Sequence, residues 1–206
     1  MMPWMWWMLA PLAAYLLGSI PTGYLLTKLL KGQDIRQAGS GNVGATNVAR
    51  VVGKVPGLIV LLLDAGKGAL AAGPMPGWWP GADAPALSML RLLAGMAVVI
   101  GHDYPCFLRF RGGKGIATAM GVLLALLPGA AGLCALVWFA VFAWSRYVSL
   151  ASIAASISLP VWLVIFGQPA AVVVFGAFLG WLAVFRHASN IRRLYLGQEP
   201  KFGNRV

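Results

Sequence analysis

The feature that most limits how this chain can fold is a succession of apolar segments that carry almost no charge. Seven such segments can be read, near residues 4–30, 55–77, 86–101, 115–128, 130–146, 148–166 and 169–185. Hydrophobic residues make up 60% of the sequence and charged residues only 10%, against about 25% charged residues in a typical soluble domain. This composition cannot cover a water-exposed surface, so the sequence predicts an integral membrane protein.

Each apolar segment is expected to be a helix. A spanning helix needs about 20 apolar residues and satisfies its own backbone groups in hydrocarbon, whereas a barrel would need alternating strands, which are not evident here. We therefore predict an all-α protein in which residues 1–206 form one polytopic membrane domain, a compact bundle of seven transmembrane helices with short interfacial helices. Pro21 should kink the first helix because it lacks a backbone N–H.

The basic residues divide the connections into two kinds. Nearly all of the 16 Lys and Arg residues lie in the first, third and fifth connections or after the last segment, whereas the connections around 78–85, 128–130 and 167–169 contain none. By the positive-inside rule, the basic connections and the C-terminus are cytoplasmic and the N-terminus is outside. Topology and anionic lipid thus explain the net charge of +11, and no nucleic-acid partner is inferred.

Three charged residues lie in the interior of the apolar segments, away from their ends. Asp64 and Lys67 are three positions apart in the second segment and share a helix face, so we expect them to pair with each other. Arg91 is expected to pair within the bundle or to extend toward the outer interface.

The first cytoplasmic connection contains the glycine-rich stretch AGSGNVGATNVAR, residues 38–50. Glycines allow backbone N–H groups to approach an anion closely. A short helix could run through Asn47 and Arg50, and its start would attract phosphate. Candidate caps for that helix are Ser40, Asn42 and Thr46. The alternative is a flexible polar loop with a capped interfacial helix.

The third connection contains GHDYPCFLRFRGGKG, residues 101–115, in which His102 and three cations surround a group of glycines. The stretch is not a nucleotide-binding P-loop, because Leu108 stands where the pattern needs its first glycine and Gly115 follows Lys114. It is either part of an anion site or a basic topology anchor with a glycine turn. Topology alone requires the cations but not the glycines.

Two further polar stretches lie near the C-terminal segments. In RYVSLAS, Ser149 and Ser152 share one helical face, and helix packing or an interhelical hydrogen bond is the alternative to a substrate contact. In FRHASNIRRLYLGQEP, His187 and Asn190 are again three apart. A juxtamembrane basic helix that binds anionic lipid would explain the arginines of this stretch, but not His187 or Asn190.

The usual catalytic constellations are not evident. There is no obvious Ser-His-Asp set, no carboxylate cluster for a metal and no aspartate-rich helix of the CDP-alcohol phosphatidyltransferase kind. The His-x4-Asp acyltransferase signature fails because Phe107 stands five residues after His102. The remaining cations and hydrogen-bond donors suit the binding of one or two phosphates beside lipid and the stabilisation of negative charge in a transition state.

Together these stretches resemble a known family. GSGNVGATNVAR, GHDYPCFLRFRGGKGIATAMG and RHASNIRRLYLGQEP resemble the three motifs of the bacterial acyl-phosphate:glycerol-3-phosphate acyltransferases of the PlsY type, and RYVSLAS and DAGKG also fit. The matches occur in order and cover nearly the whole chain, which makes them far more specific than one glycine-rich loop. The family also has seven spans, an external N-terminus and cytoplasmic motifs.

The resemblance implies an enzyme of the bacterial plasma (inner) membrane, with its active site on the cytoplasmic side. It would transfer an acyl chain from acyl phosphate to the sn-1 hydroxyl of sn-glycerol 3-phosphate, giving lysophosphatidic acid and inorganic phosphate, the first step of phospholipid synthesis. The acyl donor's own phosphate would assist deprotonation, without a covalent acyl-enzyme. No metal, nucleotide or other cofactor is implied, and no obligate protein partner; besides the two substrates, membrane lipids are the expected partners.

The resemblance also implies site residues. The catalytic set would be Arg50, Lys114, His187 and Asn190. Residues expected to bind substrate or phosphate are Ser40, Gly41, Asn42, Asn47, His102, Gly112, Gly113, Ser149, Ser152 and Arg193. Of the two serines Ser152 is preferred, and either His102 or His187 could still act as a base.

Two other classes of function remain open on sequence alone. A transporter for an organic phosphate should carry polar groups through the bilayer midplane, where this chain offers mainly Asp64, Lys67 and Arg91. A structural lipid-binding membrane protein would explain the charges but not the glycines.

Overall fold

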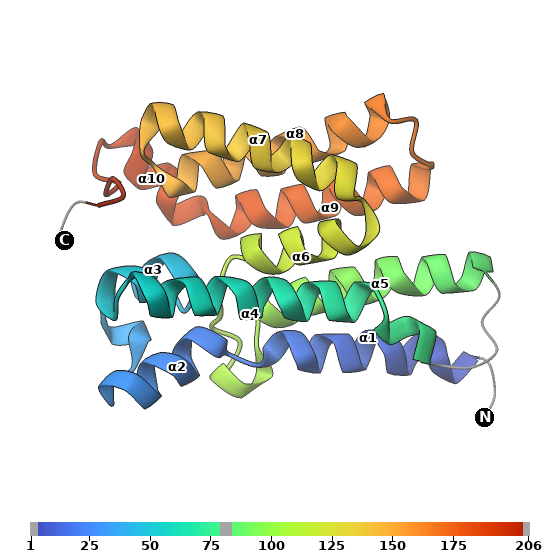
Figure 1. Cartoon of the computed structure of the whole chain (residues 1–206), viewed down its shortest axis with the longest axis horizontal. Coiled ribbons are helices and arrows are strands. Elements are labelled where there is room, and N and C mark those ends of the chain that lie inside the picture. The colour runs from blue at the N-terminus through green and yellow to red at the C-terminus, as the bar shows by residue number, and fades with distance from the viewer. Residues whose placement is uncertain (1–3, 79–83, 204–206) are drawn as a thin grey trace. The chain divides into compact units, whose positions relative to one another are not determined.

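The computed structural model describes residues 4–78 and 84–203, and in these ranges every regular element is a helix. Contacts between residues divide the chain into two compact units, Met1–Leu126 and Leu127–Val206. The predicted all-helical class is therefore confirmed (Figure 1). The prediction of one polytopic domain stays a prediction.

The first unit contains the elements up to Leu126. They are α1 (Trp4–Ser19), α2 (Thr22–Lys31), η1 (Ile35–Gln37), α3 (Ala45–Val51), α4 (Lys54–Ala72), η2 (Met75–Trp78), α5 (Ala84–Asp103), η3 (Cys106–Leu108) and α6 (Ile116–Leu126). Within it, α1 packs along α5, and α4 packs against α3, α5 and α6. The chain breaks at Ile20 and Pro21, between α1 and α2, as the proline predicted.

The second unit consists of α7 (Pro128–Ser145), α8 (Val148–Ile165), α9 (Ala170–Arg186) and α10 (Ala188–Tyr195). Helix α8 packs against both α7 and α9, and α10 packs against the same α8–α9 pair. Six of the seven predicted apolar segments each contain one α-helix close to the expected bounds, whereas the first, 4–30, divides into α1 and α2.

The apolar helices differ in whether they are long enough to cross a membrane. In the described ranges, five helical stretches are long and apolar enough to cross a membrane, and six if α9 and α10, which meet at a bend of 57°, count as one. Helix α6 has only 11 residues, and at 1.5 Å per residue it is too short to cross about 30 Å of hydrocarbon alone. Seven spans therefore stay a prediction.

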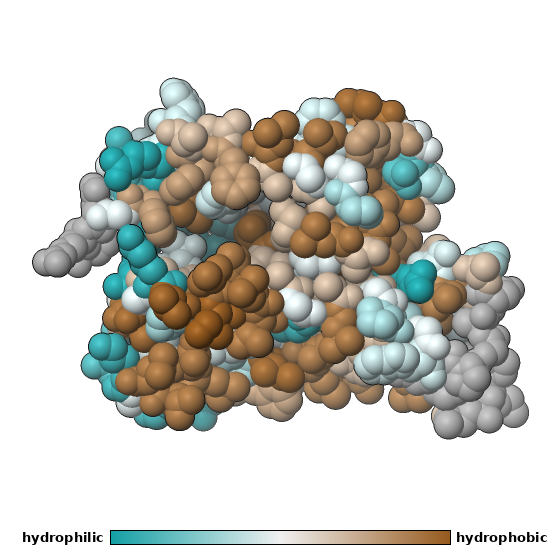
Figure 2. Space-filling model, viewed as in Figure 1, coloured by the Kyte–Doolittle hydropathy of each residue, from teal (hydrophilic) through white to brown (hydrophobic). Residues whose placement is uncertain are grey.

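Apolar side chains cover much of the face of each unit that Figure 2 shows. Leu62 on α4 and Val174 on α9 are large aliphatic residues with 63% and 68% of their surface exposed. Exposed side chains of this kind suit helices surrounded by lipid, because hydrocarbon does not penalise apolar surface as water does.

Two glycines bring α4 and α6 into direct backbone contact. A Cβ atom on Gly68 would collide with the carbonyl oxygen of Thr118, and one on Gly121 would collide with that of Ala65. Small residues at such crossings allow membrane helices to approach closely and gain van der Waals contact. This contact fixes α6, and thus the segment that precedes it, against α4.

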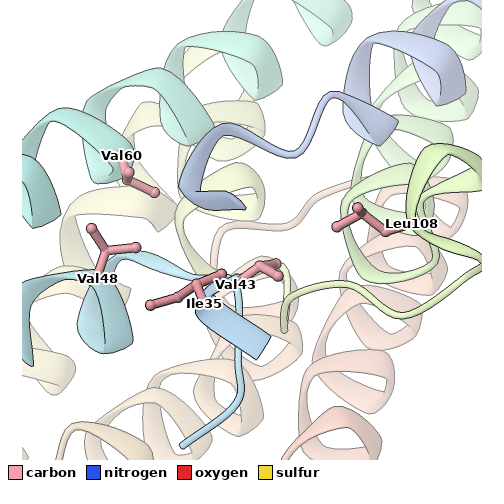
Figure 3. Packing of buried hydrophobic residues seen from close by; sticks show 5 residues of the cluster. All are labelled: Ile35, Val43, Val48, Val60 and Leu108. Carbon is pink, nitrogen blue, oxygen red and sulfur yellow. The ribbon is translucent and has the colours of Figure 1, made fainter. Parts of the chain in front are cut away.

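A small apolar cluster fastens the polar connections of the first unit to α4. It consists of Ile35, Val43, Val48, Val60 and Leu108, all buried (Figure 3). These residues come from η1, the loop before α3, α3, α4 and η3. The first and third connections, which are far apart in sequence, are thus held at the same end of α4.

We predict that Gly121→Val separates α4 from α6 and destabilises the protein by about 1–3 kcal/mol, the usual cost of overpacking. Thermal unfolding in detergent measures the effect. The matched control is Gly66→Ala on α4, where an added Cβ meets no atom within 4 Å. An equal loss of melting temperature in the two variants would contradict the proposed contact.

Candidate functional site

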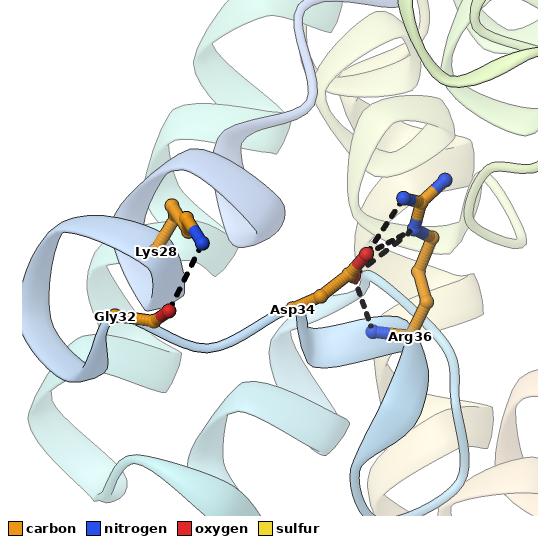
Figure 4. A network of polar contacts seen from close by, with 4 residues as sticks. All are labelled: Lys28, Gly32, Asp34 and Arg36. Atoms are coloured by element: carbon orange, nitrogen blue, oxygen red, sulfur yellow. Dashed lines mark hydrogen bonds and ion pairs between the residues drawn. The ribbon is translucent and has the colours of Figure 1, made fainter.

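The chain entering the first glycine-rich loop is held by local polar contacts (Figure 4). Lys28 Nζ donates to the carbonyl of Gly32 at the end of α2. The Asp34 carboxylate accepts from the Arg36 backbone and from its guanidinium, with a shortest ion-pair distance of 2.6 Å. The side-chain hydrogen bond from Arg36 lowers the pKa of Asp34 below its ordinary value. The loop that follows therefore starts from a fixed backbone position.

The Asn47 side chain holds this loop together from inside. It is 2% exposed. Its Oδ1 accepts from the Ser40 backbone N–H at 2.9 Å, and its Nδ2 donates to the carbonyls of Ala38 and Asn42 at 3.0 and 2.8 Å. The geometry gives Asn47 a role in shaping the loop that presents Ser40 and Gly41, and its amide is already used by the loop.

The predicted short helix is present, but its predicted cap is wrong. Helix α3 begins at Ala45, its N-cap is Gly44, and no side chain caps it. Asn42 Oδ1 instead accepts from the Gly44 backbone N–H at 2.8 Å, which tightens the turn before the helix. Thr46 lies inside the helix. Asn47 and Arg50 are three apart on α3, as expected.

The second glycine-rich segment lies directly on the end of α5. Its backbone is fixed where the Gly113 N–H donates to the His102 carbonyl at 3.0 Å. A Cβ on Gly112 would collide with that carbonyl, and one on Gly113 would collide with the imidazole of His102. Gly115 has a φ of +71°, a region that only glycine enters without cost. The glycines are thus explained by close packing on His102 and by one left-handed turn.

The two glycine-rich segments meet at one small pocket. Val43 from the first segment and His102 and Pro105 from the second line it, together with residues 18–23 at the break between α1 and α2. Within the first unit, the fold therefore brings the first glycine-rich loop, at Val43, close to His102 and Pro105 at the start of the second glycine-rich segment.

In the second unit, a carboxylate that sequence reasoning missed organises the polar residues. Glu199 is buried, and it accepts from Ser149 Oγ at 2.7 Å, Asn190 Nδ2 at 2.6 Å and Arg193 Nε at 2.7 Å. It brings together three predicted site residues from α8 and α10. Glu199 is the single glutamate of the chain, and this rarity is the one feature of the sequence that could have indicated a role for it. The neighbouring residues LGQEP do not indicate its distant partners.

Burial and hydrogen bonding act on Glu199 in opposite directions. Burial raises the pKa of this carboxyl, but the hydrogen bonds from Ser149, Asn190 and Arg193, with the charge of Arg193, outweigh it and hold the pKa below its ordinary value. The group is therefore ionised at neutral pH.

The other two predicted residues of this unit have different contacts. Ser152 Oγ donates to the Val148 carbonyl at 2.8 Å and accepts from Trp138 Nε1 of α7 at 3.1 Å, an interhelical hydrogen bond of the kind weighed against substrate contact. His187 is buried at the α9–α10 bend, where its Nδ1 donates to the Ala183 carbonyl at 2.7 Å. That hydrogen bond fixes the orientation of the imidazole ring.

No group of three or more His, Cys, Asp or Glu side chains that could hold a metal ion occurs in the ranges 4–78 and 84–203.

We predict that Glu199→Ala lowers thermal stability, because it leaves the Ser149, Asn190 and Arg193 donors without their acceptor. In Glu199→Gln the loss should depend on pH. The native pKa of Glu199 is lowered, so its stabilisation is complete above the ordinary value of about 4.3 and is lost as pH falls through the native pKa. The melting-temperature gap between wild type and Glu199→Gln should narrow below about pH 4.3.

The control for both variants is Gln198→Ala, which changes the neighbouring exposed side chain. If the difference in melting temperature between wild type and Glu199→Gln stays constant from neutral to acidic pH, the charge of Glu199 contributes nothing to stability.

Comparison with known proteins gives one consistent result. Residues 8–197 match the family model described as glycerol-3-phosphate acyltransferase. The chain is 46% identical over 194 residues to a glycerol-3-phosphate acyltransferase of Desulforamulus reducens, covering 94% of each sequence. It is 47% identical over 189 residues to one of Aquifex aeolicus, covering 92% of this chain and 95% of that protein.

Solved structures agree. The fold is similar to the crystal structure of PlsY (YgiH), an integral membrane glycerol 3-phosphate acyltransferase, in its glycerol 3-phosphate form, with a TM-score of 0.87, 44% identity and 95% of each chain covered. The lysophosphatidic acid form gives a TM-score of 0.84 at 42% identity, again with 95% of each chain covered. By its sequence and its fold, this chain belongs to the glycerol-3-phosphate acyltransferase family.

Proposed function

We propose that this protein transfers an acyl chain from acyl phosphate to the sn-1 hydroxyl of sn-glycerol 3-phosphate, releasing lysophosphatidic acid and inorganic phosphate. The observation that carries the proposal is the match over residues 8–197, together with a relative of 44% identity crystallised in a glycerol 3-phosphate form and another form with lysophosphatidic acid. These two ligands are the acceptor and the product of the proposed reaction.

Acyl phosphate is the proposed donor because its acyl group is already activated, so the protein does not have to supply a nucleophilic side chain. The acceptor hydroxyl oxygen attacks the acyl carbon, the bond from that carbon to the phosphate oxygen breaks, and the hydroxyl proton passes to the departing phosphate. The donor is already activated, so orientation and charge stabilisation suffice, and no covalent acyl-enzyme forms.

In the first unit, Arg50 and Lys114 are the proposed phosphate-binding cations. Arg50 lies on α3 and Lys114 follows the glycines that pack on His102. Cations and backbone N–H groups in a partly buried place bind phosphate far better than the same groups in water. Ser40, Gly41, Asn42, His102 and the backbone of Gly112 complete this group. Gly113, whose N–H already donates to the His102 carbonyl, is proposed to shape the segment before Lys114, as Asn47 shapes the loop that carries Ser40.

In the second unit, His187 and Asn190 are proposed to contact the reacting groups of the substrates. Ser149, Ser152 and Arg193 are proposed to assist them. Glu199 supports them by fixing Ser149, Asn190 and Arg193 in one arrangement. Since Asn190 donates to Glu199, the carboxylate sets the direction of its amide.

We further propose that the protein lies in the bacterial inner membrane with seven spans, an external N-terminus and cytoplasmic polar segments. The distribution of Lys and Arg supports this orientation. A transporter gains no support, since the charges within the apolar helices already serve structural contacts: Asp64 pairs with Lys67, and Arg91 Nε donates to the Gly73 carbonyl at 3.2 Å.

We predict that the purified protein makes lysophosphatidic acid from palmitoyl phosphate and glycerol 3-phosphate, and not from acyl-CoA or acyl carrier protein. Lys114→Ala and Arg50→Ala should lower kcat/KM by about a hundredfold or more, since each removes a charge-assisted phosphate contact worth about 3 kcal/mol. Product formation from labelled glycerol 3-phosphate measures both effects.

Matched controls remove an equivalent charge beside each residue. Arg111→Ala lies in the same segment as Lys114, and Lys54→Ala lies just after α3; both side chains are exposed. Full activity in Lys114→Ala and Arg50→Ala, or equal losses in the controls, would overturn the assignment of these two cations. An inactive wild-type protein would overturn the function itself.

The orientation is tested with single cysteines in a Cys106→Ser/Cys134→Ala background. A membrane-impermeant thiol reagent should label Gln168→Cys, in a connection without basic residues, in intact spheroplasts. Arg111→Cys should be labelled only after the membrane is opened. Labelling of Arg111→Cys in intact spheroplasts would reverse the proposed topology.

A further inference from the structure

The DAGKG stretch of α4 supplies a buried ion pair that the proposed reaction does not use. Asp64 and Lys67 are 1% and 6% exposed, and Lys67 Nζ lies 2.9 Å from Asp64 Oδ1. The expected mutual pairing is therefore confirmed. A charge pair inside an apolar helix is costly unless its remaining hydrogen-bonding capacity is also used, so its other partners indicate its purpose.

The first set of partners is at the break between α1 and α2. Lys67 Nζ donates to the carbonyls of Gly18 and Ile20 at 2.9 and 3.1 Å, and Thr22 Oγ1 donates to Asp64 Oδ1 at 2.7 Å. The break interrupts the regular helical hydrogen bonds, and a buried carbonyl without a donor is unfavourable. The Ile20 carbonyl also accepts from the Thr22 N–H at 3.1 Å, so Lys67 adds a donor there and supplies one to the Gly18 carbonyl. The pair thus stabilises the break between α1 and α2.

The second partner is His102. Its Nδ1 lies 3.5 Å from Asp64 Oδ1, and the ring is 7% exposed. The ring also lies against Gly113, where an added Cβ would collide with Nε2, and the His102 carbonyl accepts from the Gly113 N–H. His102 therefore stands between the Asp64 carboxylate and the backbone that leads to Lys114.

We propose that Asp64 is a positioning residue: its carboxylate holds a proton on His102 Nδ1 and fixes the ring, and the ring fixes the Gly113 backbone that presents Lys114. A carboxylate beside one imidazole nitrogen determines which nitrogen carries the proton and how the ring is turned. Lys67 balances the charge of Asp64 and ties both to the α1–α2 break. The consequence for catalysis rests on the proposed function, whereas the state of His102 does not.

The direct test is NMR of protein labelled with ¹⁵N-histidine. The chain has only two histidines, so His187→Gln assigns both sets of signals. In wild type, His102 Nδ1 should carry a proton. In Asp64→Asn/Lys67→Gln, which neutralises both charges and keeps hydrogen-bonding groups, this preference should be lost. A wild-type His102 protonated only at Nε2, or an unchanged spectrum in the double variant, overturns the proposal.

A double-mutant cycle measured as kcat/KM tests whether Asp64 acts through His102. Asp64→Asn/Lys67→Gln and His102→Gln should each lower kcat/KM about tenfold to a hundredfold, the usual effect of small displacements in a site. Because both changes act through one ring, the combined variant should be no worse than His102→Gln alone. The proposal is overturned if the losses of kcat/KM multiply in the combined variant, or if Asp64→Asn/Lys67→Gln is fully active.

The matched control is Arg91→Gln, which removes another charge from an apolar helix, one that contacts the Gly73 carbonyl. It should leave both the His102 signals and kcat/KM unchanged, and altered His102 signals in this variant would overturn the specific role of Asp64. If wild-type protein makes no lysophosphatidic acid while the His102 signals respond to Asp64 as expected, the proposed function fails and the positioning contact stands.

Discussion

The cost of leaving backbone carbonyls without a donor in an apolar surrounding shapes the first unit of this structure. The break between α1 and α2 exposes carbonyls that Lys67 binds, and the charge that Lys67 brings is balanced by Asp64. Asp64 in turn contacts Thr22 and His102. One irregularity in the first apolar segment thus requires a charged pair in the second, and that pair extends to the start of the third connection.

Short-range patterns predicted the helices well because hydrophobic length and proline position act locally. The seven apolar segments each contain a helix, and α1 ends just before Pro21 as expected. The short α6 shows the limit of such patterns. A window of apolar residues does not reveal how many of them join one helix, and the segment near 115–128 forms only the 11 residues of α6 before α7 begins at Pro128.

The candidate site was less predictable because its contacts are long-range or belong to the backbone. Glu199 lies 50 residues after its partner Ser149, and no spacing rule links them. Asn47 has a polar side chain of the kind that often binds ligands, yet its amide is hydrogen-bonded to three backbone groups of its own loop. Gly44 caps α3 where Ser40, Asn42 or Thr46 was expected, because Asn42 is used one turn earlier. Only the three-dimensional structure distinguishes a polar side chain that faces a substrate from one that is hydrogen-bonded within its own loop.

The bond from Lys67 to the α1–α2 break also has a meaning for biosynthesis. The carbonyls of Gly18 and Ile20 are made 49 and 47 residues before the ammonium group that binds them. The Ile20 carbonyl also accepts from the Thr22 N–H of its own segment, but the Gly18 carbonyl receives the Lys67 ammonium only after the second apolar segment has been made, since lipid offers no donors. The hydrogen bonding of the broken first segment is therefore complete only when α4 packs beside it. The helix that the ribosome makes first thus depends on a side chain of the helix that follows for one of its hydrogen bonds.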